Sequence, residues 1–186
     1  MPPLPTKPIY FGSFLVTSQV FHLTPLSFAL VNLKPLLPGH VLVSPLRSVP
    51  RLSDLSTEEV SDLFLTVQRV GRMIERVHKA SSLNVAMQDG RDAGQSVPHV
   101  HVHIIPRKAQ DMDHRGGPDA IYNMLEGEEG DVGRRLAERD GKKVEERPRP
   151  KFPVPDEANR KPRSKEEMEK EAEMLAREMD STSANL

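Results

Sequence analysis

Short apolar runs separated by turn residues dominate the first quarter of the chain. They are rich in β-branched and aromatic residues and occupy positions 9–11, 14–16, 20–23, 27–31 and 40–44. Runs of this length, bounded by Gly and Pro, predict β-strands. Gly12-Ser13 predicts a turn between the first two strands, and Thr24-Pro25 predicts another between the third and fourth.

The apolar spacing then changes from that of strands to that of a helix. Ser56 and Glu59 match a capping box, in which each residue bonds the backbone N–H of the other. Apolar residues recur beyond them at three- and four-residue intervals, which predicts an amphipathic helix over about 57–79. A further strand is predicted at 83–87, followed by a glycine-containing loop at 88–96.

Residues 99–105 alternate between imidazole and aliphatic side chains, in the order His-Val-His-Val-His-Ile-Ile. Side chains point alternately to the two faces of a β-strand, so His99, His101 and His103 are predicted to share one face. The aliphatic face suits a packed core, and Pro106 is expected to end the strand.

The last third of the chain has a different character. Residues 126–163 carry mixed charges without a sustained apolar period, and we expect a disordered insertion there. A second capping box begins at Ser164, and a thin apolar stripe predicts a C-terminal helix over about 165–179. The predicted organisation is a flexible proline-rich leader at 1–8, a domain at 9–125, the insertion, and a helix with its tail at 164–186.

Antiparallel strands, one long helix and returning strands indicate the α+β class, with a sheet of about five strands. The 186 residues suffice for one domain. The net charge of −1 gives no basis for a nucleic-acid or membrane-surface partner, and no run approaches the roughly 18 apolar residues of a membrane span. The absence of cysteine excludes disulfides and thiolate chemistry and is typical of a cytoplasmic or nuclear protein.

Three interpretations compete for the histidine face. The first is a metal site, but strand rise places the backbones of His99 and His103 roughly 13 Å apart, so those two side chains reach one ion poorly. Two adjacent histidines plus His40 could still ligate zinc or iron. The second is a pH-sensitive surface patch or an accidental run, which the strict alternation disfavours.

The third interpretation is nucleophilic catalysis at phosphorus by a histidine. Such a site needs donors for phosphate oxygens. Gly94-Gln95-Ser96, directly before the histidines, can supply them, because glycine allows close backbone approach and the next two side chains can donate. Gln88 and Asn32, each at the end of a predicted strand, are further neutral donors.

The histidine run resembles the His-φ-His-φ-His-φ-φ signature (φ, apolar) of the histidine triad superfamily of nucleotide hydrolases and transferases. Other stretches resemble its fragile-histidine-triad branch, namely Ser27-Phe28-Ala29-Leu30-Val31-Asn32, Pro38-Gly39-His40-Val41-Leu42-Val43, Met87-Gln88-Asp89-Gly90, Ala93-Gly94-Gln95-Ser96-Val97 and Pro106-Arg107-Lys108. The resemblance covers about residues 9–125 and resumes at Ser164.

This resemblance implies a histidine-triad fold, a homodimer, and hydrolysis of diadenosine triphosphate to AMP and ADP. His101 would attack the α-phosphorus and form a nucleotidyl-histidine intermediate. His103 would touch the same phosphate, while His99 and His40 would orient the strand face. The implied substrate-binding residues are Asn32, Gln88, Gly94, Gln95, Ser96, Val97 and His103. Mg²⁺ or Mn²⁺ would arrive with the polyphosphate, without a protein cage.

The same scaffold leaves two other functions open. One is a nucleotidyl transferase or nucleoside phosphoramidate hydrolase, and the other is a signalling module that binds the dinucleotide and hydrolyses it slowly. Phe11 and Leu30 are expected to wall an adenine pocket. Pro98 stands where members of the branch carry a basic residue, and Phe14 stands where they carry a polar one.

Overall fold

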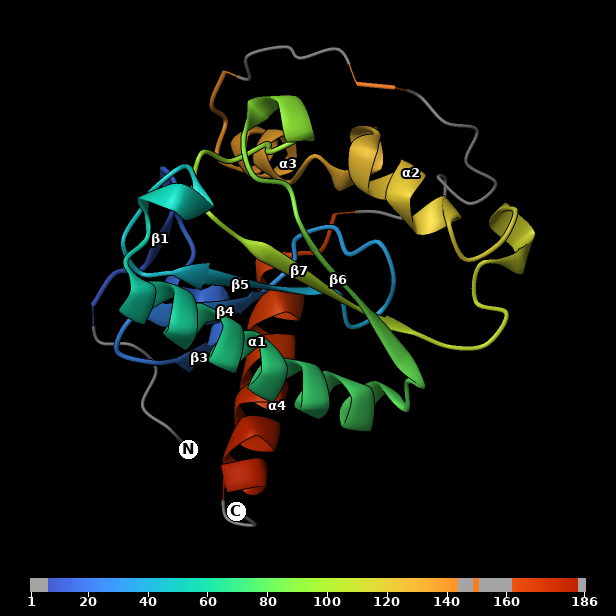
Figure 1. Ribbon diagram of the computed structural model, residues 1–186, viewed down its shortest axis with the longest axis horizontal. Helices are drawn as coiled ribbons and strands as arrows, with labels where there is room; N and C mark the ends of the chain where they lie inside the picture. Colours follow the sequence, from blue (N-terminus) through green and yellow to red (C-terminus); the bar gives the residue numbers. More distant parts are fainter. Residues whose placement is uncertain (1–6, 144–148, 151–161, 184–186) are drawn as a thin grey trace.

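A five-stranded antiparallel sheet forms the centre of the computed structural model, which describes residues 7–143, 149–150 and 162–183 (Figure 1). Its strands are β3 (Val20–Leu23), β4 (Ser27–Val31), β5 (Val41–Pro45), β6 (Ser82–Met87) and β7 (Val102–Arg107). The strand order is β3-β4-β5-β7-β6, and each neighbouring pair is antiparallel. The predicted α+β class and strand number are therefore confirmed.

A small hairpin precedes the sheet. It pairs β1 (Tyr10–Phe11) with β2 (Phe14–Leu15), and the turn contains Gly12 at φ +58°. A Cβ added to Gly12 would lie 2.7 Å from Cγ1 of Val97, so glycine lets this turn lie against the segment that leads to the histidines.

The long helix α1 (Thr57–His78) begins at the predicted capping box. Ser56 accepts from the N–H of Glu59, and the Glu59 carboxylate accepts from the N–H of Ser56. Arg47 donates twice to the same carboxylate, and these bonds lower the pKa of Glu59 to about 2. The helix ends where Lys79 adopts a left-handed conformation.

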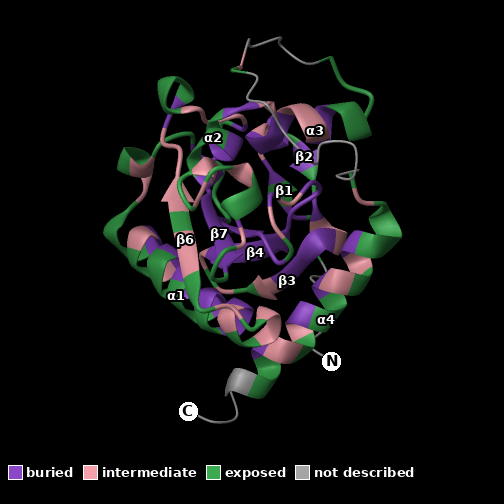
Figure 2. Ribbon diagram, turned by 90° about the vertical axis from the view of Figure 1, so that its right-hand side faces the viewer, coloured by how far each residue is buried: buried purple, intermediate pink, exposed green. Residues whose placement is uncertain are grey.

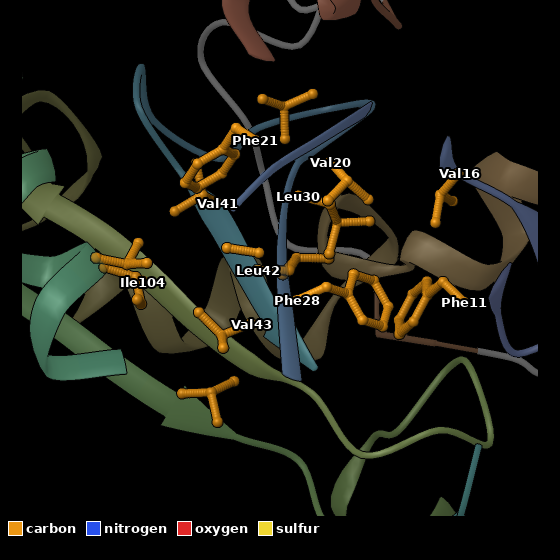
Figure 3. Close-up of a cluster of buried hydrophobic side chains, with 14 of the residues drawn as sticks. Phe11, Val16, Val20, Phe21, Phe28, Leu30, Val41, Leu42, Val43 and Ile104 are labelled. Atoms are coloured by element: carbon orange, nitrogen blue, oxygen red, sulfur yellow. The ribbon is translucent and has the colours of Figure 1, made fainter. Parts of the chain in front are cut away.

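Two layers of helices enclose the sheet. Figure 1 shows α1 and α4 (Lys165–Ser183) on one side, with α2 (Ala120–Glu126) and α3 (Val132–Arg139) on the other. The buried residues concentrate in the sheet and on the inward faces of the helices (Figure 2). In the core, Val43 and Ile104 lie on one side of the strands, and Leu42 and Phe11 lie on the other (Figure 3). None of the helices in the described ranges is long and apolar enough to cross a membrane.

The predicted C-terminal helix is present and extends four residues further than expected, to Ser183. Ser164 and Glu167 form the second capping box. The apolar stripe is buried against β3, β4 and α1, and its buried members are Met168, Ala172, Leu175 and Met179. Helix α4 therefore belongs to the same core as the sheet.

The strand predicted over 99–105 is displaced toward the C-terminus. β7 begins at Val102, because the N–H of His99 bonds the carbonyl of Val97 in a tight turn and the N–H of Val100 bonds the carbonyl of Val49. Pro106 does not end the strand. β5 pairs with β7 only as far as Ile104, so beyond that point β7 has a neighbour on one side alone, where proline is tolerated.

The expectation of a disordered insertion is wrong for the part of 126–163 that the structure describes. A 3-10 turn (Glu128–Gly130) and α3 follow α2 directly. Asp131 caps α3, and Val132, Leu136 and Ala137 are buried in the main core. The helix is too short to show a sustained apolar period, so periodicity could not reveal it. Residues 1–6, 144–148 and 151–161 lie outside the described residues, as does most of the predicted leader.

Candidate active site

A continuous row of aromatic rings crosses the face of the sheet opposite α1. The ring centroids of His40 and His103 lie 5.1 Å apart, as do those of His103 and His101. Phe11 from β1 stands edge-on to His101 at 5.1 Å and lies 5.5 Å from His99. All four histidines are buried. The structure thus brings the four histidines of the sequence prediction together.

A backbone N–H and the bond between the two rings determine which nitrogens of His40 and His103 carry protons. The N–H of Leu36 donates to Nδ1 of His40, so the proton of neutral His40 is on Nε2. That Nε2 lies 2.9 Å from Nδ1 of His103 and donates to it. Neutral His103 therefore carries its proton on Nε2, a buried atom with no hydrogen-bond partner among the described residues. His103 presents a hydrogen-bond donor to the site.

His101 has the opposite tautomer. Its Nδ1 lies 2.8 Å from the carbonyl oxygen of His99, which can only accept, so Nδ1 carries the proton. Nε2 then holds a lone pair, and it too is buried without a hydrogen-bond partner in the part of the chain that the structure describes. His99 is fixed on both sides, because Nδ1 accepts from the N–H of Gly12 and Nε2 donates to the carbonyl of Pro45. A nucleophilic nitrogen and a donor N–H thus lie on adjacent rings.

Burial keeps these rings neutral. Desolvation is the largest cause that lowers the pKa of His101 to about 4, and the bond to the His99 carbonyl acts in the opposite direction. The pKa of His103 is well below its usual range because of desolvation, with further lowering by His101, His40 and Arg149. Desolvation also lowers the pKa of His99. At neutral pH the lone pair of His101 is therefore available.

The loop before the histidines is held in place by glycine geometry and side-chain bonds. Gly94 has φ +94°, and a Cβ there would lie 2.4 Å from Nε2 of Gln88. The amide of Gln95 donates to the carbonyl of Pro50 at 2.7 Å. The Ser96 hydroxyl accepts from the N–H of Gly133 in α3. Of the two predicted phosphate donors, Gln95 therefore already donates to the protein, whereas the Ser96 hydroxyl acts in this bond only as an acceptor.

Asn32 and Val97 are buried near the histidines and the loop that precedes them. Oδ1 of Asn32 accepts from the N–H of Lys34, and its Nδ2 lies 3.5 Å from Nδ1 of His40. Val97 is fully buried under the hairpin turn. Phe11 and Leu30, expected to wall an adenine pocket, are both buried in the core.

Sequence reasoning missed one charged residue at this site. The side chain of Arg149 is only 4% exposed, and its guanidinium donates to the carbonyl of Gly94 at 2.5 Å. It lies in the charged segment that we expected to be disordered, where nothing distinguishes it from its neighbours. The residues whose backbone sets the histidine tautomers, such as Leu36, likewise carry no signal in the sequence.

The metal interpretation finds little support in this geometry. Within the described ranges, no group of three or more His, Asp or Glu side chains is arranged to hold a metal ion. His40, which would complete such a site, uses Nε2 to bond His103 and Nδ1 to accept from Leu36.

Comparisons with known proteins identify relatives of this chain. A bis(5'-nucleosyl)-tetraphosphatase [asymmetrical] of Schizosaccharomyces pombe is 51% identical over 172 residues, which cover 91% of this chain and 93% of that protein. A bis(5'-adenosyl)-triphosphatase of Dictyostelium discoideum is 44% identical over 89% of each chain. The C. elegans NitFhit crystal structure has a TM-score of 0.64 and 34% identity, and the match covers 94% of this chain but only 31% of NitFhit. The sequence profile of the HIT domain matches residues 14–110, and the chain belongs to the HIT domain family.

Proposed function

We propose that the protein hydrolyses dinucleoside polyphosphates and cleaves diadenosine triphosphate to AMP and ADP. The observation that carries this proposal is the pair of buried nitrogens on adjacent rings, a lone pair on His101 Nε2 and an N–H on His103 Nε2. A phosphoanhydride needs both, a nucleophile for phosphorus and a donor for the oxygens that gain charge. The names of the S. pombe and D. discoideum relatives favour this function over the transferase and signalling alternatives.

In the first step, Nε2 of His101 attacks the α-phosphorus. A P–N bond forms, the anhydride P–O bond breaks, and ADP leaves with the electron pair of that bond. His101 becomes an imidazolium, whose Nδ1–H donates to the carbonyl oxygen of His99. His103 donates from Nε2 to a phosphate oxygen as negative charge develops.

In the second step, water attacks the phosphorus of the nucleotidyl-histidine. The P–N bond breaks, AMP is released with the oxygen of that water, and the electron pair returns to Nε2 of His101. The proton on Nδ1 stays in place throughout, because the His99 carbonyl bonds it in both states. Of the two protons of this water, one stays on the phosphate of AMP and the other passes to solvent.

The remaining site residues bind substrate in this proposal. Gln88 and Gly94 lie on one side of the loop before the histidines, and Gln95 and Ser96 lie on the other. Asn32, next to His40, contacts the ribose, and Val97 supports the loop from below. Mg²⁺ or Mn²⁺ enters with the polyphosphate and neutralises part of its charge. The proposed setting is the cytoplasm or nucleus.

The proposed assembly is a homodimer that forms through β6. This strand lies at the edge of the sheet, and no strand in the described part of the chain pairs with its outer side. An open edge with exposed apolar side chains can bind a second copy, and Val85 on β6 is 50% exposed. Val85→Lys should shift the protein from dimer to monomer in sedimentation, and an unchanged dimer would place the interface elsewhere.

The function is tested by comparing the wild type with His101→Asn. Diadenosine triphosphate should yield equimolar AMP and ADP with the wild type, and the variant should lose several orders of magnitude in kcat while still binding the nucleotide. Comparable turnover by the variant would rule out His101 as the nucleophile. A wild type that prefers an adenosine phosphoramidate would instead support the second enzyme class.

A further inference from the structure

Two cavities flank the loop that precedes the histidines. One, of about 440 Å³, is lined by Gln88 and Gly94, and the other, of about 450 Å³, is lined by Gln95 and Ser96. Arg149 lines both cavities. This side chain therefore stands between them, over the same loop that a phosphate chain would cross.

The hydrogen bonds that Arg149 makes in this structure are ones that bonds to a phosphate could replace. Besides Gly94, the guanidinium donates to the carbonyls of Leu125, Glu126 and Gly127 at 3.2–3.3 Å, which are neutral acceptors. The carboxylate of Asp131 lies 3.3 Å from Nε. A guanidinium bonds phosphate oxygens in pairs and more strongly than it bonds neutral carbonyls. Its charge also reaches the reacting rings, because it lowers the pKa of His103.

The second cavity carries more positive than negative charge. Arg91, Arg134 and Lys143 line it together with Arg149, while Asp131 is the carboxylate in its wall. Arg134 also pairs with glutamates of its own segment, so Arg149 is the better-defined cation for a test. Pro98 lines the same cavity and brings no charge. The cationic wall thus comes mainly from the segment after α2.

We propose that Arg149, with the cationic wall of the second cavity, binds the phosphates of the leaving nucleotide during hydrolysis. The proposal rests on the function proposed above. As ADP departs, the broken bond adds negative charge to its terminal phosphate, and Arg149 stabilises that charge after exchanging its contacts with backbone carbonyls. Arg149 is in this role a substrate-binding residue specific for leaving groups that carry phosphate.

The test compares two substrates that share the attacked phosphorus. Diadenosine triphosphate has further phosphates in its leaving group, whereas the p-nitrophenyl ester of AMP has none. Arg149→Ala should lower kcat/KM for diadenosine triphosphate by about 10- to 100-fold, as expected for a lost charged hydrogen bond. The ester should change by less than about threefold. Arg149→Lys should recover part of the loss, since lysine keeps the charge but not the paired geometry.

Arg177→Ala is the matched control, because Arg177 is 63% exposed on α4 and pairs only locally with Glu173 among its ion pairs in the described residues. It should leave both substrates unchanged. Equal losses on the two substrates in Arg149→Ala would overturn the proposal and assign the residue to the fold or the nucleophile. Unchanged or faster turnover of both would overturn it as well, since Arg149 would then only close the site. A wild type that hydrolyses neither substrate would reject the proposed function itself.

Discussion

The activity of the protein should persist well into acid, because the nucleophile is a buried imidazole. Desolvation lowers the pKa of His101 to about 4 in the folded protein. At pH 5 only about a tenth of the molecules would carry a protonated, inactive His101. An exposed histidine of ordinary pKa near 6.5 would be almost fully protonated there, and the rate would fall roughly 30-fold between pH 8 and pH 5.

The assay is kcat/KM for diadenosine triphosphate between pH 8 and pH 5, because this parameter reports the ionisations of the free enzyme. The substrate has no terminal phosphate, so it contributes no phosphate titration in this range. The expected profile falls by only about a tenth at pH 5. An acid limb centred near pH 6.5 would refute the inference that burial sets the protonation of the nucleophile.

Stability must be followed over the same range. The folded pKa of His101 lies below its unfolded value, so the stability gained by burying the neutral ring is complete above pH 6.5 and is lost as the pH falls toward 4. For His101 alone the loss between pH 7 and pH 5 is about 2 kcal/mol. Circular dichroism at each pH is therefore the control, and only pH values at which the protein stays folded enter the fit.

Two further predictions concern groups around the pair. His40→Leu removes the donor that places the proton of His103 on Nε2, and it should lower kcat by about 10- to 100-fold. His40→Gln keeps a donor and should lower kcat by less. Equal effects of the two variants would contradict the tautomer assignment. In Gly133→Ala the added Cβ would lie 2.2 Å from the carbonyl oxygen of Ser96, so α3 should move off the loop. Diethyl pyrocarbonate should then modify the histidines faster than in the wild type, and equal rates would show that α3 does not shield them.

The sequence predicted the elements that depend on local patterns. The capping box at Ser56 predicted the start of α1, and the alternation around His101 predicted the shared histidine face. Both predicted features are present in the structure because they depend on few contacts between distant residues.

Other features depend on contacts between residues far apart in the sequence. The bond from Val100 to Val49 moves the start of β7, and the packing of Val132 against the main core orders α3. The role of Arg149 over the loop arises from its approach to Gly94, which lies 55 positions earlier in the chain. No local period or motif encodes such contacts, so only the composition of the charged segment was available for predicting its structure.

The central claim is that Nε2 of His101 attacks phosphorus. It is tested most directly by quenching the first turnover of labelled diadenosine triphosphate in alkaline denaturant, which preserves a phosphorus–nitrogen bond, and locating the label by mass spectrometry. The account predicts AMP on His101, formed and lost at rates that match turnover. Label on His103, or a completed first turnover with no label on the protein at any quench time, would contradict it.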